Sequence, residues 1–157
     1  MQPSLRKAEA SDVDRIAEVL VESRKAFLPF APSPHTEDEV RHWVRDVLLP
    51  DTKTTVAVIS GVVVGVVSVL AKEGRGWVEQ LYIHPTHVGQ GIGSRLLAHA
   101  LATTPTPIRL YTFQQNVRSR KFYERHGFIA VDFTNGSTNE EKCPDVLYEL
   151  APTPHAV

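Results

Sequence analysis

The sequence is poor in the features that mark secreted or membrane-bound chains. A single cysteine, Cys143, stands among 157 residues, so no disulfide can form within the chain and a reducing compartment is expected. The first residues, 1–12, carry no apolar signal segment. The longest apolar run, 62–71, is broken by Gly65 and Ser68 and is too short to cross a bilayer as a helix. These absences predict a cytoplasmic protein without a membrane partner.

An excess of charge of either sign is also lacking. Lys and Arg total 17 and Asp and Glu total 18, for a formal net charge of −1, so the charge gives no support to a nucleic-acid partner. The composition is that of an ordinary globular protein, with 42% hydrophobic and 22% charged residues. The length fits one hydrophobic core better than two. We therefore expect a single domain over residues 1–151, followed by a frayed tail at 152–157.

Hydrophobic periodicity predicts an alternation of strands and helices. Capping-box pairs, Ser11 with Asp14 and Thr36 with Glu39, indicate where the first two helices begin. β-branched residues and turn signals indicate the strands. Strands are expected at 5–9, 54–59, 62–70, 77–83, 108–113, 128–133 and 146–150, and helices at 11–21, 36–47, 92–102 and 116–126. This order predicts an α/β protein with one mixed sheet and helices on both faces.

Three glycines at alternate positions, Gly89, Gly91 and Gly93, separate an expected strand from an expected helix. Glycine allows the backbone to approach a ligand closely, and the first N–H groups of a helix attract anions. The pattern fits a phosphate cradle, although on the glycines alone a tight turn without a ligand is slightly favoured. Two other phosphate motifs fit poorly: a P-loop needs a lysine after Gly93, and a dinucleotide fold needs a glycine instead of Ser94.

The segments around the glycines decide between these interpretations. The stretch EQLYIHPTHVGQGIGSRLLAHAL resembles the central motif of the GCN5-related N-acetyltransferase (GNAT) family, in which a strand and a proline precede R/Q-x-x-G-x-G/A and a helix. Downstream, NVRSRKFYERHGF resembles the family's next motif, and the two lie in the family's order, one strand apart. The sequence departs from the motif at Val88, where family members usually carry Arg or Gln. Because the family mainly uses backbone amides of this loop, Val88 weakens the match little.

The resemblance implies a GNAT-like acyl-CoA N-acyltransferase fold, with a mostly antiparallel sheet, a splayed parallel pair of strands and helices on both faces. It also implies acetyl-coenzyme A as the donor of the acetyl group. The pyrophosphate is expected on the glycine loop and the pantetheine arm along the preceding strand. The implied cofactor-binding residues are Leu81, Tyr82, Ile83, Val88, Gly89, Gln90, Gly91, Ile92, Gly93, Ser94, Asn116, Ser119 and Tyr123.

Two side chains are candidates for catalysis. The resemblance implies that Tyr123 lies near the sulfur and acts as general acid for the leaving thiolate; the alternative is packing within a Phe-Tyr pair. Glu79 is the candidate base. It lies in an otherwise apolar strand beside Trp77, Leu81 and Ile83, which are expected to be buried on the same face, and burial would raise its pKa toward a useful range. An exposed sheet carboxylate without a catalytic role explains Glu79 equally well.

The resemblance implies an acceptor site on the far side of the splay, between segments 27–35 and 139–145. Acidic residues there could bind a cationic amine and aromatic residues could form apolar walls, although a solvated loop and core packing are the simpler alternatives. The candidate substrate-binding residues are Phe30, Trp77, Tyr111, Glu140 and Glu141. Together, the motifs and these candidate residues predict an enzyme that moves an acetyl group to a primary amine by direct attack in a ternary complex. The amine could belong to a small molecule or to a protein. A sensor of acetyl-coenzyme A without efficient transfer is the alternative.

The remaining predictions concern metals and subunits. His84 and His87 lie three positions apart with no third ligand in sight, which is a weak metal motif, so no metal is expected. The last expected strand, 146–150, is predicted to form an exposed sheet edge that a second subunit could extend. The sequence therefore leaves both a monomer and a homodimer open.

Overall fold

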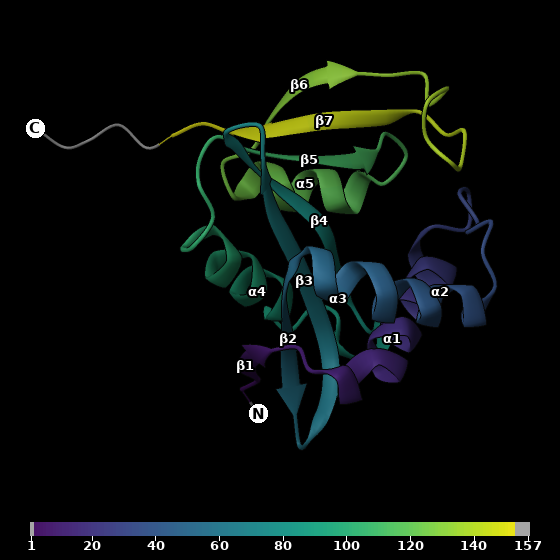
Figure 1. Ribbon diagram of the computed structural model, residues 1–157. Helices are drawn as coiled ribbons and strands as arrows, with labels where there is room; N and C mark the ends of the chain where they lie inside the picture. The colour runs from purple at the N-terminus through teal and green to yellow at the C-terminus, as the bar shows by residue number, and fades with distance from the viewer. Residues whose placement is uncertain (1, 153–157) are drawn as a thin grey trace, which may run out of the picture.

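One mixed sheet forms the centre of the molecule (Figure 1). The computed structural model describes residues 2–152, and seven strands lie in the order β1-β2-β3-β4-β5-β7-β6. The strands are β1 (Ser4–Lys7), β2 (Lys53–Ile59), β3 (Val62–Lys72), β4 (Arg75–Ile83), β5 (Ile108–Phe113), β6 (Ile129–Phe133) and β7 (Asp145–Leu150). Every neighbouring pair is antiparallel except β4 and β5. The expected fold class, a mostly antiparallel sheet with one parallel pair, is confirmed.

Helices enclose a hydrophobic core on each face of the sheet. They are η1 (Ala10–Asp12), α1 (Val13–Phe27), α2 (Glu37–Trp43), the π-helical turn η2 (Val44–Leu48), α3 (Leu49–Asp51), η3 (Pro85–His87), α4 (Ile92–Leu101) and α5 (Val117–Arg125). One core joins α1 and η2 to the sheet through Ile16 and Val44. The other joins α4 and α5 to the sheet through Leu96 and Tyr123. The sheet therefore separates two packing layers, and each layer contributes one wall of the site described below.

The first helical segment does not begin with the capping box expected at Ser11. The N–H of Glu9 donates to Asp12 Oδ2 at 2.8 Å, and Arg6 donates to both carboxylate oxygens of Asp12, at 2.7 and 2.9 Å. The Arg6 guanidinium lowers the pKa of the Asp12 carboxyl. The capping box therefore begins at Glu9, with Asp12 as its acidic partner three residues later, and the guanidinium from β1 stabilises the Asp12 carboxylate. The second expected capping box, which begins at Thr36, is present.

A β-bulge interrupts β4 at Glu79. Ser68 of β3 pairs with Gln80, while the next residue, Val69, pairs with Val78, so Glu79 has no counterpart on β3. Such a bulge bends its strand and increases the twist. β4 pairs with β5 only as far as Trp77, and the two strands separate beyond it. The bulge therefore accompanies the divergence of the parallel pair.

The bulge also corrects one prediction about the faces of β4. Leu81 and Ile83 pack against the same core as Val78. Trp77, the neighbour of Val78, points to the opposite face, where its ring stacks on Tyr111. Strict alternation places Trp77 beside Leu81 and Ile83, but the extra residue reverses the alternation between them.

The outer edge of the sheet lies at β6, not at the segment 146–150. β7 pairs with β5 on one side and with β6 on the other, so the prediction of an exposed edge there was wrong. After β6 the chain turns back, so that β7 lies between β5 and β6. Hydrophobic β7 residues such as Val146 and Tyr148 are therefore fully buried. β6 instead exposes Ile129, Val131 and Phe133.

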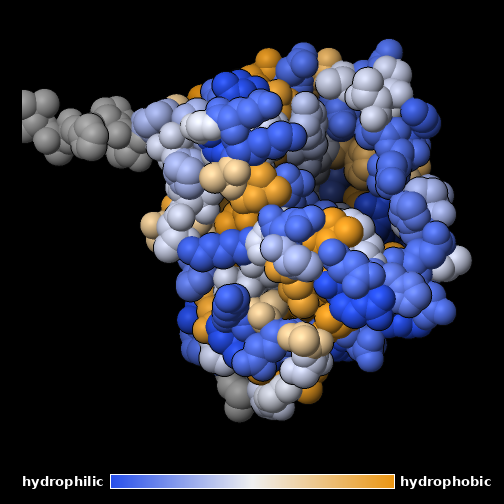
Figure 2. Space-filling model, viewed as in Figure 1, coloured by the Kyte–Doolittle hydropathy of each residue, from blue (hydrophilic) through white to orange (hydrophobic). Residues whose placement is uncertain are grey.

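The face of the molecule seen in Figure 2 is mainly hydrophilic, with small and separated apolar areas. Such scattered apolar side chains are normal on a protein surface. Within residues 2–152, no helix combines the length and apolar character that crossing a membrane requires.

Candidate functional site

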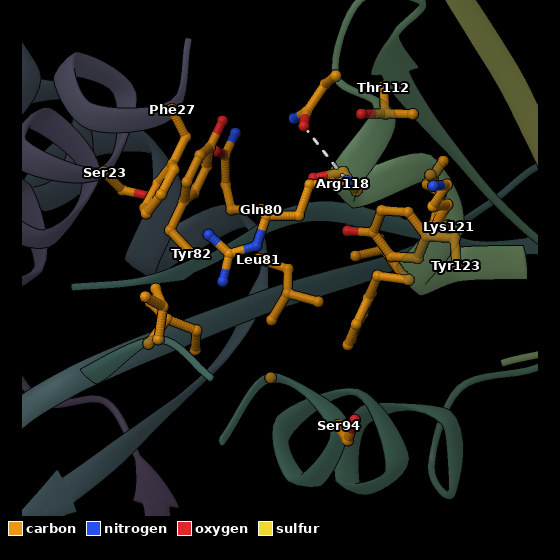
Figure 3. A pocket seen from close by; sticks show the side chains of 18 of the residues that line it. Ser23, Phe27, Gln80, Leu81, Tyr82, Ser94, Thr112, Arg118, Lys121 and Tyr123 are labelled. Atoms are coloured by element: carbon orange, nitrogen blue, oxygen red, sulfur yellow. Dashed lines mark hydrogen bonds between the residues drawn. The ribbon is translucent and has the colours of Figure 1, made fainter. Parts of the chain in front are cut away.

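A cavity of about 600 Å³ lies where β4 and β5 diverge, with α1, α4 and α5 around it. Figure 3 shows Ser23 and Phe27 of α1 on one side and Lys121 and Tyr123 of α5 on the other, with Leu81 between them. The cavity brings together most of the residues predicted for the cofactor and for catalysis: Glu79, Leu81, Tyr82, Ile83, Val88, Gly89, Gly91, Ile92, Gly93, Ser94, Asn116, Ser119 and Tyr123. Tyr111, predicted for the acceptor, lines it too. Gln90 is exposed and is not among the lining residues.

The glycine loop leads directly into α4. Gly91 is the N-cap residue with φ of 79°, and Gly89 has φ of 76°, a left-handed conformation that costs an L side chain energy. A Cβ at either position would meet nothing within 4 Å, so backbone conformation, not crowding, is the reason for glycine here. The N–H of Arg95 donates to the Gly91 carbonyl at 3.2 Å, and the N–H groups before it have no intrahelical acceptor. These groups, at the edge of the cavity, form a backbone surface suited to an anion.

The strand β4 supplies the wall next to this loop. Leu81, Tyr82 and Ile83 line the cavity. Because the pairing of β4 with β5 ends at Trp77, the side of β4 that faces β5 beyond that point has no strand partner. Main-chain N–H and C=O groups in such a position are available to a ligand that carries amide groups.

The start of α5 is fixed by Asn116. Its side-chain Oδ1 accepts a hydrogen bond from the N–H of Ser119 at 3.2 Å, which is the usual arrangement of an N-cap. Both residues line the cavity. Asn116 therefore has a structural role in addition to the ligand contact predicted for it.

Tyr123 lies about two turns beyond Asn116 on α5 and is buried, with 8% of its surface exposed. Its ring lies edge-on to Phe122 and Phe128, at centroid distances of 5.2 and 5.7 Å. Burial raises the pKa of the Tyr123 phenol well above its ordinary value, and Tyr82 adds to the effect. The hydroxyl group is therefore protonated at neutral pH and can act as a donor inside the cavity.

A hydrogen bond joins the two helices that flank the cavity. Ser94 Oγ of α4 lies 3.0 Å from Nε2 of His126, which follows α5. Burial, helped by Arg125, lowers the pKa of His126, so its imidazole is neutral at pH 7. The pair holds the N-terminus of α4 against the end of α5.

Glu79, the bulge residue, lies at the junction of two hollows. It lines the main cavity and also a smaller one. Partial burial raises the pKa of the Glu79 carboxyl, while Lys72 acts in the opposite direction. A carboxylate with a raised pKa accepts a proton more readily than an ordinary one, as a general base must.

Sequence reasoning missed three cations of α5 that line the cavity. Arg118, Lys121 and Arg125 follow one another at spacings of three and four residues, which places them on one face of the helix. The Arg118 guanidinium lies over the ring of Phe27, 4.7 Å from its centroid, so this side chain reaches across from α5 to α1 (Figure 3). The helical spacing of the cations was the signal that could have identified them.

The α1 wall was identified only in part. Phe27 and Leu28 line the cavity and lie in the segment 27–35 predicted for the acceptor, whereas Ser23, which also lines the cavity, was missed. In the sequence its spacing from these residues is that of any helix face that packs on a sheet. No local signal distinguishes a helix residue that lines a cavity from one in the core.

The two predicted acceptor loops contact each other. Glu141 forms an ion pair with Arg24 at 3.0 Å, and Glu140 lies 3.1 Å from His35. Phe30 lies edge-on to Phe113, at a centroid distance of 5.9 Å. Phe30, Glu140 and Glu141 are not among the cavity-lining residues. The two acidic side chains already have partners, so a cationic ligand would have to compete for them.

The two histidines of the loop after β4 have a local role. Both His84 Nδ1 and His87 Nδ1 lie within hydrogen-bond distance of Thr86 Oγ1, at 2.8 and 2.9 Å. Over the described range 2–152, no group of three or more His, Cys, Asp or Glu side chains is arranged to hold a metal ion.

Comparisons with known proteins agree with this geometry. A sequence profile of the acetyltransferase (GNAT) family matches residues 17–128. An uncharacterised N-acetyltransferase of Archaeoglobus fulgidus is 28% identical over 131 residues, which are 76% of this chain and 88% of that protein.

Two solved structures share the fold. The PaiA N-acetyltransferase of Thermoplasma acidophilum, in complex with coenzyme A, has a TM-score of 0.78 at 23% identity, and the match covers 97% of this chain and 100% of that one. YncA of Salmonella typhimurium, with its cofactor acetyl-CoA, has a TM-score of 0.74 at 21% identity, over 100% of this chain and 98% of that one. At these identities the likeness concerns the fold.

Proposed function

The chain belongs to the acetyltransferase (GNAT) family, and on that premise we propose that it transfers the acetyl group of acetyl-coenzyme A to a primary amine by direct attack in a ternary complex. One observation carries the proposal. A single cavity connects the glycine loop, the unpaired side of β4, the phenol of Tyr123 and the carboxylate of Glu79. An anion site, a site for an amide-bearing arm, an acid and a base are thus combined in one space.

The donor is assigned to the wall formed by β4, the glycine loop and α5. Backbone N–H groups from Gly89 to Ser94 would hold the pyrophosphate, with additional positive charge from Lys121 and Arg125. The main chain of 81–83 would pair with the amides of the pantetheine arm in the manner of an added strand. Asn116 and Ser119 would flank the arm where α5 begins.

Glu79 and Tyr123 are assigned opposite proton transfers. Glu79, directly or through a water molecule, accepts a proton from the ammonium group and so frees the lone pair of the nitrogen. The nitrogen attacks the thioester carbonyl, a C–N bond forms and the C–S bond breaks. Tyr123 donates a proton to the departing sulfur and is reprotonated by the proton that the new amide nitrogen loses. The products are an N-acetyl amine and free coenzyme A.

The acceptor is assigned to the side of the splay opposite the donor, where Tyr111 and Trp77 form an aromatic surface next to Glu79. Phe30, which packs on Phe113, would form the outer boundary of the acceptor site. Glu140 and Glu141 carry less weight as amine ligands because each already has a partner.

Tyr123→Phe and Glu79→Gln test the mechanism. Each is expected to lower kcat for thiol release by about a hundredfold or more, the usual contribution of a general acid or base. Acetyl-coenzyme A binding, measured by calorimetry, should persist in both variants. Tyr148→Phe is the matched control, because Tyr148 is a buried tyrosine whose hydroxyl bonds Glu124 at 2.7 Å and which does not line the cavity.

Wild-type protein that binds acetyl-coenzyme A but releases no thiol with a broad panel of primary amines and peptides would contradict the proposal. That result would identify a sensor of the cofactor. Transfer that survives both substitutions undiminished would reject the roles given to Glu79 and Tyr123.

A further inference from the structure

A second hollow, of about 240 Å³, adjoins the main cavity at the bulge of β4. Its lining is short: Lys72, Glu73, Trp77, Glu79 and Tyr111. Glu79 and Tyr111 also line the main cavity. The carboxylate proposed as the base is therefore accessible from two directions, and only one of them passes the glycine loop.

The floor of this hollow is an aromatic stack. The rings of Trp77 and Tyr111 lie nearly parallel, at an interplanar angle of 16° and a centroid distance of 6.0 Å. Tyr111 has 55% of its surface exposed, so one side of the stack is open to solvent. Trp77 lies in the last residue pair of β4 and β5, opposite Arg109, and Tyr111 pairs with Leu147 of β7, so both rings stand on paired positions of the sheet.

Ionisable groups around the stack favour a cation. Lys72, Glu73 and Glu79 together carry a formal charge of −1. Arg109 on the same face is neutralised by Glu149, whose Oε1 lies 2.8 Å from Arg109 Nε. An ammonium group in the hollow would balance this charge, and the exposed face of the aromatic stack would be available to a flat apolar group.

We infer that this second hollow is the entrance and binding site of the acceptor, and that the acceptor is a protonated primary amine on a flat apolar body such as an aromatic ring. The ring would stack on Tyr111 and Trp77, and the ammonium group would point to Glu79 with Glu73 beside it. The assignment to an acceptor rests on the proposed function; the preference for a flat cationic ligand rests on the hollow alone.

The chain offers a direct reporter for this site. It has two tryptophans, and Trp43 lies in α2, so Trp43→Phe leaves Trp77 as the single tryptophan, whose emission is excited selectively over that of the tyrosines. Titration with 2-phenylethylamine should change Trp77 emission saturably. Hexylamine, which has the ammonium but no ring, and phenylalanine, which adds a carboxylate to the ring, should bind at least fivefold more weakly.

Substitutions of Tyr111 test whether the aromatic stack binds the amine. Tyr111→Ala should weaken 2-phenylethylamine binding about tenfold and raise its KM similarly, without a change in the KM of acetyl-coenzyme A. Tyr111→Phe keeps the ring and should recover most of the affinity. Phe133→Ala is the matched control, because Phe133 is an aromatic residue equally exposed, at 55%, on β6, outside the lining of both hollows; it should behave as wild type.

The two proposals fail in distinguishable ways. Equal binding of hexylamine and 2-phenylethylamine, a preference for phenylalanine, or no effect of Tyr111→Ala would overturn the inference, even in an active enzyme. Thiol release with other amines, without any change in Trp77 emission, would also overturn the inference but would leave the proposed function standing. Saturable binding at Trp77 without thiol release would support the site and overturn the transfer.

Discussion

The two sides of the main cavity, which we assign to the donor and to the acceptor, are built from different kinds of groups. The donor side consists largely of main chain: the N–H groups of the glycine loop and the unpaired side of β4. Most of it lies within one short stretch of sequence, 81–94. The acceptor side consists of side chains that come from separate elements, among them Glu79 at the bulge and Tyr111 on β5. A main-chain surface recognises features common to all molecules of one cofactor, whereas side chains can change one at a time.

The comparison has a thermodynamic side. Backbone groups are held by secondary structure, so the donor wall is ordered before a ligand arrives. The exposed Tyr111 and Glu79 side chains of the acceptor wall are not fixed by packing on all sides. Apart from the two residues proposed for proton transfer, Glu79 and Tyr123, substitutions on the donor side should therefore act on cofactor affinity, and substitutions on the acceptor side on acceptor affinity. Three further predictions test this division, from the largest expected effect to the smallest.

Gly91→Ala should affect the donor side most. The left-handed φ of 79° disfavours a side chain by about 1–2 kcal/mol, and relaxation of this strain would turn the amides away from the phosphates. We expect the Kd for acetyl-coenzyme A to rise about tenfold, the effect of losing one well-placed charge-assisted hydrogen bond.

Gly61→Ala is the matched control for that prediction. Gly61 has φ of 77° and, like Gly91, has open space around a built Cβ, but it lies in the turn between β2 and β3. Both variants should lose similar stability in urea unfolding, and only Gly91→Ala should lose cofactor affinity. Equal cofactor binding by the two variants would remove the glycine loop from the donor site.

Arg118→Met tests whether the division into two sides is strict. Arg118 belongs to α5 but lies over Phe27 of α1, so it contacts both walls. We assign it to the donor phosphates and expect the Kd for acetyl-coenzyme A to rise about fivefold, with a weaker dependence on salt. Calorimetry at two ionic strengths measures both. An unchanged cofactor Kd together with a higher KM for the amine would move Arg118 to the acceptor side.

Lys72→Met should have the smallest effect, a shift in the pH profile. Burial raises the pKa of Glu79 and Lys72 lowers it, so removing the lysine charge raises that pKa further. Since the base must be ionised, kcat/KM falls as the pH drops through this pKa, and the acid limb should move to higher pH in the variant. Lys7→Met, which changes an exposed lysine of β1, should leave the profile in place. A shift to lower pH would exclude Glu79 as the titrating base.

The cavity wall that we propose for the donor contains residues that the sequence had already indicated. Gly89 and Gly91 have the conformations that explain their presence, and the motif around Tyr123 led to a tyrosine that lines the same cavity. These features are local, because each follows from a few neighbouring residues. The order of helices and strands, which depends on periodicity, was also correct.

The geometry of the acceptor side and the sheet edges could not be predicted in this way, although Glu79, Trp77 and Tyr111 were among the candidate residues. The bulge at Glu79 reverses the faces of β4, and no residue in WVEQLYI marks an insertion. β7 lies between β5 and β6 because the chain turns back after β6. The composition of a strand does not indicate where in the sheet it will lie. The ion pair between Arg24 and Glu141 joins residues 117 positions apart, so their partners become visible only in the folded chain.

The bulge has a consequence for how β4 can vary. Because one residue of β4 is unpaired, the alternation of side chains between the two faces of the sheet changes phase at Glu79. A point substitution at Glu79 alters one group, but deletion of this residue would remove the bulge itself: Val78 and Gln80 would pair with β3 in a regular ladder, and Trp77 and Leu81 would stay on opposite faces. Deletion of Glu79 should therefore leave the fold and the two faces of β4 intact, and should remove the proposed base together with the bend that accompanies the divergence of β4 from β5.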